Sequence, residues 1–440
     1  AAMPAAEAPA FSNPAEDPLP VRSEYEARAP SPAILGRARA ATFWRAYEDS
    51  YYGPADFAWF AEQGIGLLRL PFNHRHFDDS WPDHPPGRGF DLLQRCLDQA
   101  AGHGLLVLLD LHAAPGCQAV DWNDDCSDGV ARFWREPALQ AQTCELWRAI
   151  AERFHDHPAL FGYDPLCEPV ADRPEALNGF YRACCRAIRS ADPSGIITLE
   201  PDQWARDAAS LARDLFDDPQ VIVQSHVYPQ QHLPIAGLRS YPDPDAGIDR
   251  AALRSILKPT LDQDRIQRPG LIGEFGCHWD RQTPAAHDLF CDFARLMGED
   301  GLHWSLWAGK DLDAMGVLQP MSNSPWRALL ERPAIAGLRA RLSADFGVSF
   351  LPGTCGGRLQ RGLQALVHDE PDREAVARAS REAKRHVDPL ILRAILRTLA
   401  LLPEDELLDC ARGFAFRHCR PHPRAADLLN RTRSGSIPTH

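Results

Sequence analysis

Two glutamates in this sequence stand at the carboxyl ends of short apolar segments. Glu168 follows the segment 160–167 and is itself followed by Pro169, which cannot continue a strand ladder. Glu274 ends the apolar segment 271–274. If both segments are strands of one parallel sheet, the two carboxylates face the same edge and form a pair suited to acid–base chemistry. The alternative is structural: one glutamate is a buried ion-pair partner and the other lies beside a helix N-cap.

Other chemically capable side chains also follow apolar runs. The strand ends that carry them are Arg69-Leu70-Pro71, Asp110-Leu111-His112, His226-Val227-Tyr228 and Trp307. An arginine beside Glu274 would lower the pKa of that carboxyl group and keep it charged. A tryptophan would offer an apolar face to a ligand.

The elements that must position these residues alternate between strands and helices. Seven apolar runs end near residues 70, 111, 167, 199, 225, 274 and 307. Helical patterns separate them, at about 91–101, 138–154, 174–190, 205–215 and 284–298. This alternation predicts an α/β fold with a parallel sheet, a (β/α)8 TIM barrel. Such a barrel has eight strands, and the first is expected before residue 57, where no good candidate exists.

The flanking segments differ in composition from the barrel region. Residues 1–40 are rich in Ala, Pro and Glu and are expected to form an N-terminal arm, extended or disordered. Residues 41–343 are the expected barrel domain. Residues 344–440 carry helical patterns alone and are expected to form a small C-terminal helical extension, packed on the barrel or forming a homodimer contact.

Composition narrows the class of partner. A net charge of −13 makes nucleic acid or an anionic membrane an unsuitable partner. No apolar run is long enough to cross a bilayer, and the N-terminus lacks the pattern of a signal peptide. The 12 cysteines are irregularly spaced and form no CxxC pair, which indicates buried reduced thiols. A cytoplasmic location is expected, with a removed leader as the alternative.

Taken in order, the strand ends resemble those of glycoside hydrolase family 5, of the clan A barrels, over roughly residues 55–330. Finer features resemble its subfamily-18 group, which includes β-mannosidases acting on short mannose-containing oligosaccharides. Those features are the segments 70–77, 110–118 with Asp121-Trp122, and 307–316, together with Phe414-Ala415-Phe416-Arg417 in the helical tail.

The resemblance implies a role for each matching residue. Glu168 matches the general acid/base and Glu274 the nucleophile of a retaining mechanism, in which two carboxyl groups lie about 5–5.5 Å apart. The remaining matches line the site or orient the nucleophile, and they are Arg69, His112, His226, Tyr228 and Trp307. A retaining β-glycosidase acting on a short β-linked oligosaccharide or glycoside, β-mannosidase-like or β-glucosidase-like, is therefore expected.

One position departs from the family pattern. The residue before the acid/base is normally Asn, which donates a hydrogen bond to the sugar 2-hydroxyl; here it is Cys167. A thiol is a weak donor and a weak acceptor. The chain is then a slow enzyme, an enzyme for a sugar altered at C2, or a degenerate relative that only binds carbohydrate. No motif supplies Cys167 with a base of its own, which disfavours a role as nucleophile.

Several further residues have two possible roles each. Trp122 is expected to lie in a substrate-facing loop, and the acidic run around it only faintly resembles a calcium loop. Glu200 ends its strand on the site side and binds a substrate hydroxyl or pairs with Arg206. The isolated tryptophans are either further platforms or packing residues, and they are Trp81, Trp204 and Trp279. No metal and no cofactor is expected.

Overall fold

The computed structural model describes residues 24–78, 81, 87–120, 124–126, 130–261, 266–311, 315–346, 358–367, 369, 371–372, 375–376 and 389–433. Within these residues the chain divides into two compact units. The barrel unit draws on residues 52–310, 315–318 and 421–433, and the helical unit on residues 24–51, 311 and 319–420.

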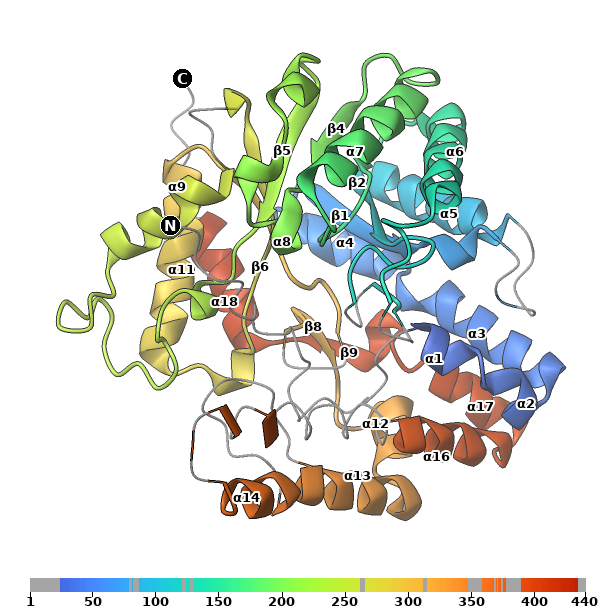
Figure 1. Cartoon of the computed structure of the whole chain (residues 1–440). Coiled ribbons are helices and arrows are strands. Elements are labelled where there is room, and N and C mark those ends of the chain that lie inside the picture. The colour runs from blue at the N-terminus through green and yellow to red at the C-terminus, as the bar shows by residue number, and fades with distance from the viewer. Residues whose placement is uncertain are drawn as a thin grey trace. The chain divides into compact units, whose positions relative to one another are not determined.

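Seven parallel strands form the sheet of the barrel unit, hydrogen-bonded in the order in which they occur in the sequence (Figure 1). They are β1 (Leu67–Asn73), β2 (Leu106–Ala113), β3 (Leu160–Asp164), β4 (Ile196–Leu199), β5 (Val221–His226), β6 (Gly270–Phe275) and β7 (His303–Leu306). A separate two-stranded sheet pairs β8 (Leu318–Pro320) with β9 (Cys419–Pro421). Sequential parallel order requires a crossover after every strand, and the intervening helices provide it.

Helices or short 3-10 turns follow the strands. The helices of the barrel unit are α4 (Pro54–Glu62), α5 (Arg88–Gly102), α6 (Pro137–Phe154), α7 (Pro174–Arg189), α8 (Asp202–Ala205), α9 (Arg250–Leu261), α11 (Pro284–Glu299) and α18 (Pro423–Arg433). Its 3-10 turns are η1 (His74–His76), η2 (Ala208–Ser210), η3 (Arg213–Phe216), η4 (Pro229–Gln231) and η5 (Trp279–Arg281). Proline at the first turn begins α4, α6, α7 and α11, where its missing N–H costs nothing.

Both faces of the sheet are covered, and the strands carry buried polar side chains among mostly apolar ones. Every residue of β6 is buried, and β2 is buried from Val107 to Leu111. Leucine, isoleucine and valine fill the space between sheet and helices. The buried polar residues of the strands point the other way, into the interior of the barrel, which is where the site forms.

The predicted barrel fold is confirmed, but its wall differs from the expected one. No strand occurs between residues 24 and 66, where the first of eight strands was expected; that part of the chain is helical. The two edge strands β1 and β7 come within 8 Å between Cα atoms without forming a ladder. The barrel is therefore nearly closed by seven strands.

The prediction of a helix at 205–215 is wrong. Gln203, Trp204 and Ala205 have positive φ angles of 58–59°, which end regular right-handed helix there. The segment that follows consists of the turns η2 and η3. The Asn178 side chain on α7 fixes it, since the Asn178 amide donates to the Ser210 carbonyl and its oxygen accepts from the Ala212 N–H.

The helical unit combines the first described segment, residues 24–51, with residue 311 and the described residues from 319 to 420. Its helices are α1 (Glu24–Arg28), α2 (Ser31–Leu35), α3 (Arg37–Tyr51), α12 (Pro325–Leu330), α13 (Pro333–Phe346), α14 (Arg358–Gln364), α16 (Pro389–Ala400) and α17 (Glu404–Ala411), with the turn η6 (Phe416–His418). Phe43 of α3, Leu399 of α16 and Phe414 share one apolar core. Residues 24–40 are thus largely helical, where an arm was expected, and residues 1–23 lie outside the described part.

Among the described helices, none is both long enough and apolar enough to cross a lipid bilayer.

Candidate active site

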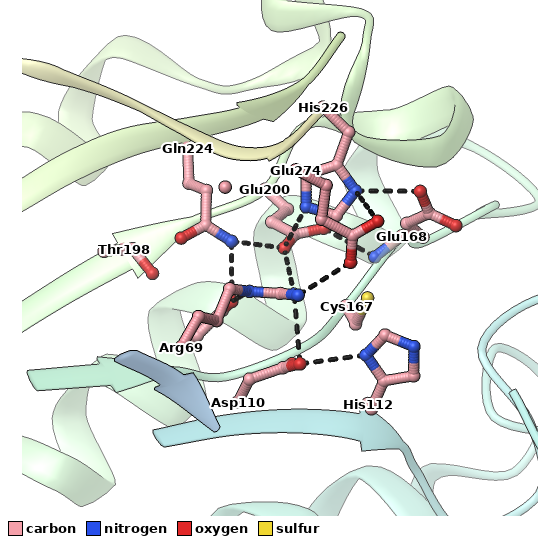
Figure 2. Close-up of polar contacts among 12 residues, drawn as sticks. Arg69, Asp110, His112, Cys167, Glu168, Thr198, Glu200, Gln224, His226 and Glu274 are labelled. Atoms are coloured by element: carbon pink, nitrogen blue, oxygen red, sulfur yellow. Dashed lines mark hydrogen bonds and ion pairs between the residues drawn. The ribbon is translucent and has the colours of Figure 1, made fainter. Parts of the chain in front are cut away.

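A single buried arginine organises the interior of the barrel. Arg69 on β1 donates from Nη1 to Glu274 Oε1 at 2.7 Å and from Nε to Asp164 Oδ2 at 2.9 Å (Figure 2). Its Nη2 lies 2.9 Å from Glu200 Oε1 and 3.1 Å from Asp110 Oδ2. These four carboxyl groups come from four different strands or strand ends, so one guanidinium links most of the sheet.

Glu274, on β6, is held at both oxygens. Oε1 accepts from Arg69, and Oε2 accepts from the Tyr228 hydroxyl at 2.8 Å. Burial raises the pKa of Glu274 above its ordinary value, while the charges of His226 and Arg69 oppose that rise. The expected effect of Arg69 is present, but the prediction of a lowered pKa is wrong because desolvation outweighs it.

Glu168 is held differently, just beyond the end of β3. Its Oε1 lies 2.8 Å from Nδ1 of His226. Its own backbone N–H donates to Glu200 Oε2 at 2.6 Å, with a φ of +44° at Glu168. A left-handed conformation in a residue with a Cβ is unfavourable, and the short bond to Glu200 helps to maintain it.

The two carboxylates predicted to form a pair do converge. Glu168 and Glu274 bring carboxylate oxygens within 4.8 Å of each other and of a His226 ring nitrogen. Both residues are only 4% exposed. This limit applies to the nearest oxygens, and it is of the order of the carboxyl separation in a retaining glycosidase, about 5–5.5 Å, compared with about 6.5–9.5 Å in an inverting one.

His226 lies among three carboxylates. Its Nδ1 is 2.8 Å from Glu168 and 3.5 Å from Glu274, and its Nε2 is 3.1 Å from Glu200. Burial alone would lower the pKa of His226, but Glu200 and Glu274 outweigh it and raise that pKa well above its usual value. The surrounding carboxylates therefore favour the protonated form of the ring.

Trp307 and His112 form a second wall. Their rings are stacked, with centroids 5.2 Å apart and planes 7° from parallel. His112 Nδ1 is 2.9 Å from Asp110 Oδ2. Burial opposes protonation of His112, yet the Asp110 charge raises its pKa. The predicted site residues Arg69, His112, Cys167, Glu168, His226 and Glu274 thus lie around one interior (Figure 2), with Tyr228 and Trp307 in direct contact with members of it.

Cys167 is fully buried at the base of this group. Its Sγ lies within 4.8 Å of ligand atoms of Asp110 and His112. Burial raises the pKa of the thiol well above its ordinary value. Gln118 donates to the Cys167 carbonyl at 3.0 Å and to the His112 carbonyl at 2.7 Å, which ties the end of β2 to the segment after β3.

The isolated tryptophans were further candidates for the site. Trp122 lies outside the described residues. Trp279 is fully buried and donates to the Met315 carbonyl, and Trp81 is 4% exposed against the His76 ring, so both are packing residues. Trp204 is half-buried with the Arg206 guanidinium 5.3 Å from its ring centroid.

Sequence reasoning misjudged Glu200 and missed two further residues. Glu200 is fully buried and binds Arg69 and His226, so neither expected role, a substrate hydroxyl or Arg206, applies. Asp164 and Gln224 complete the cluster, with Gln224 donating to Asp164 and to Glu200. The signal for both was a polar side chain inside an otherwise apolar strand.

Three groups of described residues bring potential metal ligands within 4.8 Å. Two of these groups lie in the site: Glu168 with His226 and Glu274, and Asp110 with His112 and Cys167. A His226 ring that is protonated on both nitrogens has no lone pair for a metal. The arrangement is suited to proton transfer and nucleophilic attack by carboxylates.

The family comparison agrees with this geometry. Residues 37–313 match the model of the cellulase family, glycosyl hydrolase family 5. The match spans more than half of the chain, and the protein belongs to this family.

Particular relatives differ in what they act on. A β-xylosidase of Phanerodontia chrysosporium is 28% identical over 322 residues, which cover 70% of this chain and 66% of that protein. Endoglucanase C of Acetivibrio thermocellus is 24% identical over 189 residues, 42% of this chain and 53% of that protein. The chain thus matches about half to two thirds of the length of these curated relatives. A solved glycoside hydrolase structure matches the fold with a TM-score of 0.50 at 22% identity, covering 60% of this chain and 83% of that one.

Proposed function

We propose that this protein is a retaining β-glycosidase, with Glu274 as nucleophile and Glu168 as general acid/base. The observation that carries the proposal is the convergence of the two carboxylates within 4.8 Å, each with a different set of partners. Arg69 and Tyr228 hold Glu274 from both oxygens, as an attacking carboxylate requires. Oε1 of Glu168 faces the His226 ring, so the acid/base is oriented by a different group from those that hold Glu274.

The reaction would proceed in two displacements. In the first, Glu168 protonates the leaving oxygen while a Glu274 oxygen attacks the anomeric carbon. In the second, Glu168, now a carboxylate, removes a proton from water, which attacks the same carbon and releases Glu274. Esterification removes the negative charge of Glu274, and this lowers the affinity of Glu168 for its proton and favours its role as base.

The substrate class that we propose is a short β-linked oligosaccharide or a β-glycoside. The relatives include a β-xylosidase and endoglucanases, so xylose and glucose join mannose as candidate sugars. Trp307, stacked on His112, offers an apolar face to the sugar ring. Cys167 supplies no strong hydrogen bond near the sugar 2-hydroxyl, which favours a sugar altered at C2.

Cys167 also supports the second candidate function, that of a catalytically degenerate relative that binds carbohydrate. Loss of a hydrogen bond that strengthens in the transition state lowers the rate by a factor on the order of 100 to 1,000, by analogy with an oxyanion-hole donor. A chain with Cys167 in this position would then retain sugar binding with little turnover.

Three further assignments, of subfamily, location and oligomeric contact, accompany the proposed glycosidase function. We propose membership of the subfamily-18 group, a cytoplasmic location and a homodimer contact through the C-terminal helices. Motif resemblance supports the first proposal, and the free thiols of all described cysteines support the second. The exposed side chains of Leu390 on α16 and Leu401 just after it support the third.

Hydrolysis of a panel of aryl β-glycosides tests the function. The panel holds the mannoside, glucoside, xyloside, N-acetylglucosaminide, fucoside and arabinoside, with Glu274→Ala as the inactive control and Cys167→Asn beside the wild type. Turnover by the wild type that is lost in Glu274→Ala is the expected result. If the wild type is inert and only Cys167→Asn turns over, the degenerate reading holds. Inert preparations of both contradict the catalytic proposal for these sugars.

A further inference from the structure

Glu200 is a fully buried carboxylate that touches the acid/base and its neighbours without facing the substrate side. Its Oε2 accepts the Glu168 backbone N–H at 2.6 Å. Its Oε1 lies 2.9 Å from Arg69 Nη2 and 3.1 Å from His226 Nε2, and it also accepts from Gln224. It is fully enclosed, so it takes no part in substrate contact.

The contacts of His226 fit a ring that is protonated on both nitrogens when its carboxylate neighbours are ionised. A neutral imidazole has one N–H and one lone pair, so it would direct a lone pair at one of the two carboxylates. Here Nδ1 faces Glu168 and Nε2 faces Glu200. When Glu168 and Glu200 are both ionised, both contacts are attractive only if each nitrogen carries a proton. The cation then sits between the acid/base on one side and Glu200 on the other.

We propose that Glu200 is a positioning residue that keeps His226 as an imidazolium and, through that ring and the Glu168 backbone, aims the acid/base. This inference rests on the proposed glycosidase function. Glu200 acts by two routes: its Oε1 is the counter-ion of His226, and its Oε2 fixes the left-handed backbone of Glu168.

The charges around His226 are consistent with this role. The titratable groups that face it are Glu168, Glu200 and Glu274, and Arg69 shares the Glu200 oxygen that faces the ring. Burial disfavours ionised Glu200, but His226 and Arg69 hold its pKa at about 2. Glu200 is thus a permanent negative charge beside the ring. Glu168 and Glu274 change charge during the two displacements.

The imidazolium matters most in the second displacement. When Glu168 has given its proton to the leaving group, a carboxylate is left in a buried site. His226, with its proton retained on Nδ1, stabilises that carboxylate and orients it toward water. Without Glu200 the ring would lose a proton at a lower pH, and this support would disappear as pH rises.

The variant Glu200→Gln tests the proposal because it removes the charge and keeps the size. An aryl glycoside with a good leaving group makes the second displacement rate-limiting, so kcat reports the base step. We expect the alkaline limb of the kcat profile to move at least one pH unit lower. At pH 8 kcat should fall at least tenfold, with a much smaller loss at pH 5 and little change in KM.

Two matched variants separate this effect from loss of structure. Glu200→Asp keeps the charge and should retain more of the alkaline limb than Glu200→Gln. Asp164→Asn changes a carboxyl group that shares the Arg69 and Gln224 neighbours of Glu200 but leaves the His226 contacts in place, and burial raises the pKa of Asp164 well above its ordinary value. Asp164→Asn should leave the limb at its wild-type pH.

Imidazole nitrogen NMR provides a readout without turnover. The His226 signal, assigned by its loss in His226→Asn, should show two protonated nitrogens at pH 8 in the wild type and a neutral ring in Glu200→Gln. A wild-type His226 that titrates near pH 6.5, or an unmoved kcat limb in folded Glu200→Gln, would overturn the proposal. If the wild type hydrolyses no glycoside, the proposed function fails, and the NMR result still decides the role of Glu200.

Discussion

The Tyr228 hydroxyl donates to Glu274 Oε2 at 2.8 Å, on the oxygen opposite to the one that Arg69 binds. The carboxylate is therefore oriented by one guanidinium from β1 and one phenol from the segment that follows β5. A charged acceptor makes such a hydrogen bond worth about 1.5–3 kcal/mol. The first prediction concerns this bond.

Tyr228→Phe should lower kcat/KM about 10- to 100-fold, because 1.4 kcal/mol corresponds to a factor of ten. Steady-state hydrolysis of the preferred aryl glycoside measures it. Tyr163→Phe is the matched control: it removes a buried hydroxyl that donates to Asp192, away from the site. That control should lower the free energy of unfolding and leave kcat/KM unchanged. Equal losses in both variants would contradict a specific role for Tyr228.

The acid limb of kcat/KM should lie above pH 4.5. Glu274 attacks as a carboxylate, and burial raises its pKa above the ordinary value, so activity falls as pH drops through the raised pKa. A pH profile with an activated aryl glycoside locates the limb, and circular dichroism at each pH excludes unfolding as the cause. A limb below pH 4.5 in folded protein would show that Arg69 and His226 outweigh desolvation.

The sequence allowed much of this site to be predicted because the strand ends carry information locally. Glu168, Glu274 and Arg69 each follow or lie in a short apolar run, and parallel strands bring such positions to one edge. The two glutamates could therefore be paired before their distance was known, although residue types alone could not say that desolvation would exceed the effect of Arg69.

Other features depend on tertiary contacts that have no local signal. Glu200 precedes Pro201 much as Glu168 precedes Pro169, yet Glu200 is fully enclosed whereas Glu168 remains 4% exposed. The residues Gln203–Ala205 have a left-handed backbone but include no glycine, so the sequence gives no local signal for this turn. The expected first strand before residue 57 is absent for a related reason. That part of the chain contains α3, which packs with helices more than 300 residues later in the chain.

Arg69→Met should destabilise the protein by about 3–5 kcal/mol, as expected when one partner of a buried ion cluster is removed. Arg69 has a side chain 4% exposed and neutralises carboxylates that would be left buried without a cation. Urea unfolding at pH 7 measures the change. Arg148→Met, which breaks surface pairs with Glu145 and Glu152, is the control and should have little effect. Similar losses in the two variants would contradict the central role of Arg69.

Trp204→Ala should weaken binding of the leaving-group side of the substrate. The Trp204 backbone donates to the Pro169 carbonyl beside the acid/base, and Glu168 protonates the leaving oxygen in the proposed mechanism. A sugar or aromatic ring leaving from there would meet the half-buried indole. KM for a disaccharide should rise about tenfold, while kcat/KM for a glycosyl fluoride, which has no leaving ring, should be unchanged. An equal effect on both substrates would exclude this subsite.

Thiol alkylation should distinguish Cys167 from Cys144. Burial raises the pKa of Cys167, and its side chain is fully enclosed. Cys144 is half-buried on α6, and its contact with Cys184 lowers its pKa. Because the thiolate is the reactive form, iodoacetamide at pH 8 should modify Cys144 well before Cys167 and leave glycosidase activity intact.

Mass spectrometry of peptides taken during the alkylation time course gives the order, and activity assayed on the same samples gives the consequence. Cys144→Ser serves as the control and should remove the early adduct without changing kcat. Early modification of Cys167 with parallel loss of activity would show that this thiol is accessible and ionised. The buried thiol beside Asp110 would then have to be reconsidered as a reactive group.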